Sequence, residues 1–184
     1  KELYRQRFSR GITMGPLEHV GPTPNRRGTS VSFVPDDQIF GPELHFKPAR
    51  LYKLARSKAY LFAGVEIRWK CSPELISDDT PAEAVFQFPG GLADHLREQI
   101  ATRECATADF FSGSQDFPDG PGGMKMGRVE WAVSWPLWSD GSYSWYCNTI
   151  PTPDGGTHEA GLRAALVKGI RGYGEMVSQK KAKD

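Results

Sequence analysis

The chain has 184 residues, 39% of them hydrophobic, and a formal net charge of +1 at pH 7. This length and composition predict one soluble globular domain, or one domain with a fragment of another, that buries a hydrophobic core. A nearly neutral chain has no overall basic field, so any contact with nucleic acid must come from a local face. The sequence has no signal peptide and no apolar run of about 18 residues, so we expect no membrane contact.

The cysteines indicate the cellular compartment of the protein, and the first residues indicate whether the chain is part of a longer one. Cys71, Cys105 and Cys147 are odd in number, widely spaced and without a CxxC pair. This pattern argues against a cysteine zinc site and indicates reduced thiols in the cytoplasm. The chain opens on alternating residues without an initiator methionine, so we expect it to be part of a longer protein.

The first half of the chain predicts strands that alternate with helices. Alternating polar and apolar residues indicate the strands, and Pro48 suits the first turn of a helix. The Gly- and Pro-rich stretch 14–28 is predicted to be a loop, and the strands on either side of it could pair as an antiparallel ribbon. The predicted strands span 3–9, 29–34, 65–71 and 85–88, and the predicted helices span 48–60 and 92–102.

The second half predicts a hairpin followed by a long helix. The stretch 112–127 is rich in Gly, Ser, Asp and Pro, which predicts a flexible loop. Asp140-Gly141 is a turn signal that would join a strand over 129–135 to a return strand over 143–147. A helix over 157–177 follows, with Thr157 as its N-cap. The whole pattern predicts an α+β fold with a largely antiparallel sheet covered by helices.

Most motifs of enzyme chemistry are missing from the sequence. It contains no GxxxxGK(S/T), HExxH or GxSxG motif, and its four histidines share no metal-ligand spacing. Two pairs of adjacent acids, Asp36-Asp37 and Asp78-Asp79, lie beside prolines and cannot face each other across a substrate. The stretch 120–123 is Gly-rich but precedes a strand instead of the helix that a phosphate loop requires. These observations predict no complete catalytic site and no metal site in this chain.

Two features near the C-terminus could bind an anion. The stretch 155–158, Gly-Gly-Thr-His, leads into a helix whose first N–H groups are unpaired, although an ordinary strand-to-helix turn has the same sequence. Arg163, Lys168 and Arg171 could contact DNA phosphates, but three basic residues spread over roughly 140° of a helix also form a solvated face. The residues alone leave both alternatives open.

Two longer blocks resemble the B subunits of type IIA DNA topoisomerases. They are Asn-Thr-Ile-Pro-Thr at 148–152 and Gly-Gly-Thr-His-Glu-Ala-Gly-Leu-Arg-Ala-Ala at 155–165. Upstream, 27–36 is similar to the closing strand of the family's ATPase module, and 86–92 is similar to its FxYxGG segment. The similarity extends over nearly the whole chain. The blocks at 24–29 and 148–152 look closer to topoisomerase IV than to gyrase.

The resemblance implies a two-part organisation and an ATP-driven reaction. Residues 1–40 would be the last strands of a GHKL ATPase module, and residues 41–184 would be a transducer with the ribosomal protein S5 domain 2-like fold. In this family, ATP binding dimerises two B subunits and closes a gate on double-stranded DNA. The transducer passes closure and hydrolysis to the core that cleaves DNA with the topoisomerase A subunit.

The resemblance also assigns roles to individual residues. Gly28 and Thr29 match positions near the adenine of ATP, and Arg163 matches an arginine that faces the DNA cavity. Lys168 and Arg171 are weaker candidates for the same cavity. The family's catalytic Glu and Mg²⁺-binding Asn would precede Lys1, and its γ-phosphate Lys would follow Asp184. We therefore expect ATP and Mg²⁺ to act in the parent enzyme, and this chain alone to bind neither and to be inactive.

Two other functions remain as alternatives. A free-standing S5-like module could bind nucleic acid by itself, although the nearly neutral charge argues against it. A relay domain of another GHKL ATPase, such as a mismatch-repair protein, would share the fold but not the blocks at 155–165.

Overall fold

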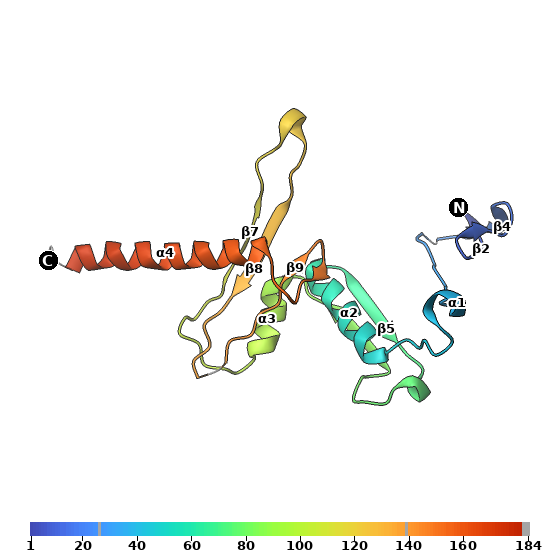
Figure 1. Cartoon of the computed structure of the whole chain (residues 1–184), viewed down its shortest axis with the longest axis horizontal. Coiled ribbons are helices and arrows are strands. Elements are labelled where there is room, and N and C mark those ends of the chain that lie inside the picture. The colour runs from blue at the N-terminus through green and yellow to red at the C-terminus, as the bar shows by residue number, and fades with distance from the viewer. Residues whose placement is uncertain (26, 139, 182–184) are drawn as a thin grey trace. The chain divides into compact units, whose positions relative to one another are not determined.

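The computed structural model describes residues 1–25, 27–138 and 140–181. The chain forms two compact units, one over Lys1–Lys47 and one that begins at Pro48. The first is blue in Figure 1, and the second runs from the teal helix α2 to the red helix α4.

Short antiparallel ladders form the first unit. Strand β1 (Glu2–Arg5) pairs with β4 (Glu18–Pro22), and β2 (Phe8–Ser9) pairs with β3 (Ile12–Thr13). The strand predicted over 3–9 is therefore confirmed as two shorter strands. The predicted loop over 14–28 is wrong in part, because it contains β4.

In the first unit, Arg10 links a β-turn to a short helix through a hydrogen bond. Arg10 and Gly11 join β2 to β3 with φ of 52° and 79°, the positive values that a two-residue type I′ turn requires. The Arg10 Nε donates to the Asp36 Oδ2 at 2.6 Å, and Asp36 also caps helix α1 (Asp37–Phe40) by accepting from the Gln38 N–H. The hydrogen bond from Arg10 lowers the pKa of the Asp36 carboxyl.

The segment after Gly28 does not form the predicted strand. Residues 29–34 have no ladder partner among the residues that the structure describes, and Val31, Phe33 and Val34 are 79%, 71% and 90% exposed. Their alternation suits a strand, but β1 pairs with β4 instead, so the predicted ribbon of 3–9 with 29–34 is wrong. A strand needs a partner edge as well as a pattern.

A helix on a two-stranded hairpin starts the second unit. Helix α2 (Pro48–Leu61) contacts β5 (Glu66–Lys70) and β6 (Glu83–Gln87), which pair antiparallel with Trp69 opposite Ala84. The connection between these strands contains a 3₁₀ turn over Pro73–Leu75. These elements confirm the helix predicted over 48–60 and the strands predicted over 65–71 and 85–88.

The core of this unit is small and aromatic. Ala59 and Tyr60 from α2 are buried with Phe86 and Phe88 from β6 and its end. The ring of Tyr52 meets that of Phe86 edge to face, with centroids 5.0 Å apart, which is a favourable aromatic geometry.

The next hairpin projects from the rest of the unit (Figure 1). Helix α3 (Leu92–Ile100) contacts β8 (Arg128–Val133), and β8 pairs antiparallel with β7 (Phe111–Asp116). The connection contains a 3₁₀ turn over Pro121–Gly123. The predicted loop over 112–127 is therefore wrong in its first part, which is strand β7.

A third hairpin replaces the one expected at Asp140-Gly141. Strand β9 (Tyr146–Cys147) pairs with β10 (Ile150–Pro151) and not with β8, so the predicted hairpin is wrong. Its turn, Asn148-Thr149, has φ of 47° and 66°. The Lys58 Nζ of α2 donates to the carbonyl and the hydroxyl oxygen of Thr149, both at 2.7 Å, and so holds this unusual turn.

Helix α4 (Thr157–Lys181) ends the described chain. The Gly156 carbonyl accepts from the Ala160 N–H at 3.1 Å, which places Gly156 at the cap and makes Thr157 the first helical residue. The predicted N-cap at Thr157 is therefore wrong by one residue. Ile170 and Tyr173 of α4 are 58% and 66% exposed.

The fold is α+β, as predicted. All ladders among the described residues are antiparallel, and the helices α2 and α3 pack on strands. None of the helices in residues 1–25, 27–138 and 140–181 is both long and apolar enough to span a membrane.

Candidate functional site

Arg163 lies in a cluster of charged and aromatic side chains near the start of α4. Its Nε donates to the Glu159 Oε1 at 2.7 Å, one helical turn earlier. Its guanidinium carbon lies 5.4 Å from the ring centroid of Tyr143 and 5.5 Å from that of Trp145. The side chain remains 54% exposed, so this cation is held by its neighbours and still reaches solvent.

The three neighbours of Arg163 were not among the predicted site residues. Tyr143 and Trp145 are two residues apart in a segment without regular secondary structure, and their ring centroids lie 6.2 Å apart. The spacing of four between Glu159 and Arg163 is a helical ion-pair signal that could have identified one of them. Nothing in the local sequence indicates that the aromatic segment lies against α4.

The connection into α4 is a packed turn. A Cβ at Gly156, where φ is 154°, would lie 2.9 Å from the Cε1 and Nδ1 of His158. The His158 Nε2 lies 3.1 Å from the Thr152 Oγ1, and its ring meets Trp145 edge to face. The glycine therefore leaves room for a histidine that links α4 to the preceding segment, which favours the strand-to-helix interpretation of 155–158.

Lys168 and Arg171 lie apart from this cluster. Both are exposed on α4, and neither has a carboxylate within 4.0 Å among the described residues. At 100° per residue they point roughly 140° and 80° away from Arg163 around the helix. The structure does not bring the three predicted DNA contacts into one group.

Gly28 and Thr29, the predicted adenine neighbours, lie in the first unit. Both are exposed in the segment without regular structure, and Gly28 has a φ of 128°, which favours glycine. No side-chain hydrogen bond of Thr29 occurs within the described part of the chain.

A buried polar atom, the Nδ1 of His95, lies in the aromatic core of the second unit. The ring of His95 stacks on Tyr60 with centroids 3.8 Å apart, and its Nδ1 is buried without a hydrogen-bond partner. The hydroxyls of Tyr60 and Tyr146 are 2.6 Å apart, which connects α2 to β9. Burial raises the pKa of Tyr60 and lowers the pKa of His95, with the nearby Arg56 guanidinium lowering the latter further.

This environment predicts that acid destabilises the second unit. Because the pKa of His95 is lower in the folded state, the unfolded chain binds more protons below its ordinary pKa of about 6.5. The stability that neutral His95 contributes is complete above that pH and is lost as pH falls through the folded-state pKa. Urea unfolding at pH 7.5 and pH 5 should show this loss. A His95→Leu variant should lose less stability between the two pH values, and equal losses would contradict the prediction.

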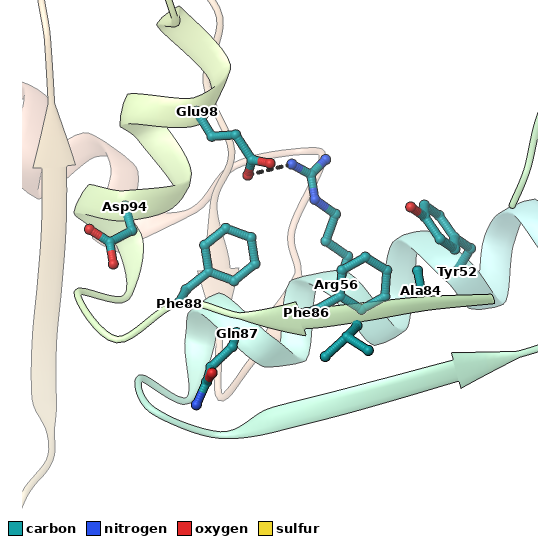
Figure 2. A pocket seen from close by; sticks show the side chains of 9 residues that line it. Tyr52, Arg56, Ala84, Phe86, Gln87, Phe88, Asp94 and Glu98 are labelled. Atoms are coloured by element: carbon teal, nitrogen blue, oxygen red, sulfur yellow. Dashed lines mark hydrogen bonds and ion pairs between the residues drawn. The ribbon is translucent and has the colours of Figure 1, made fainter.

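A surface pocket lies between α2, β6 and α3 (Figure 2). The Arg56 Nη2 donates to the Glu98 Oε2 at 2.7 Å across it, and the Arg56 guanidinium carbon lies 6.0 Å from the centroid of Phe88. The rest of the wall includes Phe86 and Asp94. None of the predicted site residues lines this pocket.

The metal-ligating residue types do not gather in this structure. Within residues 1–25, 27–138 and 140–181, no three His, Cys, Asp or Glu side chains are close enough to hold a metal ion. The three cysteines are unpaired thiols.

Comparison with known proteins identifies the family. The family model described as DNA gyrase B matches residues 91–184. The chain is 49% identical over 180 residues to the B subunit of DNA topoisomerase 4 from Caulobacter vibrioides, with 96% of this chain and 25% of that protein covered. This chain belongs to the DNA gyrase B family. The resemblance to type IIA topoisomerase B subunits is thereby confirmed.

Other members of the family agree in sequence and in structure. The B subunit of DNA topoisomerase 4 from Bartonella bacilliformis is 48% identical over 99% of this chain and 26% of its own length. The chain therefore spans about a quarter of the length of these curated relatives. The 43K ATPase domain of Thermus thermophilus gyrase B, solved with an aminocoumarin, has 28% identity and a TM-score of 0.68, covering 95% of this chain and 44% of that one.

A more distant structure supports the fold alone. The B subunit of the DNA gyrase from Myxococcus xanthus has 21% identity and a TM-score of 0.67, covering 90% of this chain and 45% of its own. These neighbours agree with the α+β fold expected for a GHKL and transducer region.

Proposed function

We propose that this chain is the segment of a type IIA topoisomerase B subunit that couples ATP binding and hydrolysis to DNA gate closure and strand passage. The observation that carries the proposal is the 49% identity to the B subunit of a topoisomerase 4 over 96% of the chain. Identities of 48% and 42% to two more proteins of that name favour the topoisomerase IV type. In this proposal residues 1–40 are the last strands of the ATPase module, and residues 41–184 are the transducer.

The proposal assigns the ligands and partners to the whole enzyme. ATP and Mg²⁺ act in the ATPase module, with Gly28 and Thr29 near the adenine. A second B subunit joins when ATP binds, and the topoisomerase A subunit supplies the cleavage core. The site of action is the cytoplasm. The transducer works as a two-state element whose equilibrium depends on the nucleotide.

Arg163 is the proposed contact to the transported DNA. Its side chain is more than half exposed and ends in a cationic guanidinium, so it can meet a phosphate without reading sequence. Lys168 and Arg171 are proposed as secondary contacts from the same helix, because both are exposed there.

Replacing Arg163 with glutamine in the full-length B subunit, assembled with its A subunit, tests this contact. We expect the DNA concentration for half-maximal stimulation of ATP turnover to rise about tenfold, because a charge-assisted hydrogen bond to phosphate is lost. A plot of the logarithm of this DNA concentration against the logarithm of the salt concentration should also be less steep, by about one unit of slope. Turnover without DNA should fall less than the stimulated rate.

Arg68→Gln provides the matched control, because Arg68 is also an exposed arginine bonded to a nearby glutamate, but on β5. It should leave the DNA dependence unchanged. If Arg163→Gln lowers basal and stimulated turnover equally, Arg163 serves folding and the proposed contact is wrong.

A further inference from the structure

The side chains around Arg163 restrict how its guanidinium can lie. Its Nε is bonded to Glu159, and the faces of Tyr143 and Trp145 lie within 5.5 Å of its central carbon. The two terminal nitrogens have no hydrogen-bond or carboxylate partner among the described residues. One edge of the guanidinium is thus fixed, and the opposite edge stays available to an incoming oxygen.

Tyr143 contributes little to a buried core. Tyr143 is 65% exposed, and Trp145 is the one aromatic side chain that its ring meets among the residues that the structure describes, with centroids 6.2 Å apart. An exposed ring that buries little apolar area stabilises a fold weakly. A cation over its face gains an electrostatic attraction that remains at exposed sites.

From this geometry we infer that Tyr143 and Trp145 form an aromatic platform that positions Arg163 for a backbone phosphate of duplex DNA, with Glu159 fixing the Nε edge of the guanidinium. The platform comprises these two rings only. Tyr143 and Trp145 are positioning residues, since they act through the arginine. A long flexible side chain that is already ordered loses less conformational freedom when it binds, so the platform strengthens the contact without adding charge. This inference rests on the proposed DNA contact of Arg163.

Tyr143→Leu tests the platform, because it removes the aromatic face at an exposed position. In the full-length B subunit assembled with its A subunit, the DNA concentration for half-maximal stimulation of ATP turnover should rise about two- to fivefold. The salt dependence should keep its slope, since the number of cations that meet phosphates is unchanged. Tyr143→Phe should keep the original value, because the phenyl ring retains the aromatic face beside Arg163.

Tyr173→Leu is the control, because Tyr173 is an equally exposed tyrosine, at 66%, on α4. It should not move the half-saturating DNA concentration. The platform is refuted if Tyr143→Leu matches the unsubstituted protein, or if Tyr143→Phe is as impaired as Tyr143→Leu. If Arg163→Gln is impaired while Tyr143→Leu is normal, only the platform fails. If Arg163→Gln is itself normal, the proposed DNA contact fails as well.

Discussion

Replacing Phe86 with alanine is expected to lower the free energy of unfolding of the second unit by about 3–5 kcal/mol. Phe86 is 7% exposed and packs with Ala59, Tyr60 and Phe88 in a core with few other buried members. The substitution removes a ring from between α2 and β6 and leaves a cavity that the small core cannot fill. Urea unfolding followed by circular dichroism at 222 nm should measure the loss, and the variant is expected to be partly unfolded without urea.

Val85→Ala is the control on the same strand. Val85 points to the other face of β6 and is 64% exposed, so its truncation should change the free energy of unfolding by less than about 0.5 kcal/mol. If the two substitutions cost the same amount, the described packing of Phe86 is not the source of stability.

Replacing Gly156 with alanine is expected to cost about 1–3 kcal/mol of stability. The new Cβ would meet the His158 ring at 2.9 Å, and a φ of 154° is strained for any side chain. The ring must then move away from the Thr152 hydroxyl, 3.1 Å from its Nε2, and from the face of Trp145. Thermal unfolding should show a lower midpoint.

Gly169→Ala, inside the helix that Gly156 precedes, is the opposite case. A Cβ at Gly169 would have nothing within 4 Å, and this residue lies inside α4. Alanine should therefore raise stability by about 0.5–1 kcal/mol, because glycine loses more conformational entropy in a helix. A loss at Gly169 as large as that at Gly156 would show that the crowding at His158 is not the cause.

Local pattern predicted the elements better than their partners. The alternation around Trp69 and the helical spacing after Pro48 gave β5 and α2 with nearly correct bounds. These signals come from one face that is buried, and they do not depend on which element covers it. The strand predicted over 29–34 has the same alternation, yet it has no partner in the described chain.

The hairpin of β7 and β8 shows why pairing was mispredicted. Gly113 and its neighbours are weak strand formers, so 112–127 was expected to be a loop. In the structure Gly113 lies opposite Trp131, and a Cβ there would come within 2.9 Å of the indole. Glycine makes room for tryptophan at this position, which becomes visible only when the cross-strand neighbour is known.

The candidate site was predictable only in part. Arg163 followed from the family resemblance, and its spacing from Glu159 is readable on a helix. Its contact with Tyr143 and Trp145 depends on the chain reversing at Asn148-Thr149, a turn with two non-glycine residues at positive φ. Such a turn has no strong local signal and is held by Lys58 from a distant helix.

Helix α4 contains Gly161, Gly169, Gly172 and Gly174, and none of them has a neighbour within 4 Å of its missing Cβ. Each lowers the intrinsic stability of the helix by about 0.8–1 kcal/mol relative to alanine. A helix with this many glycines bends more easily than one with alanine at those positions, and three of the four glycines follow Arg163. The axis of α4 beyond that arginine will therefore adapt to the surface it packs on, while its first turn stays anchored by the contact of His158 with Thr152.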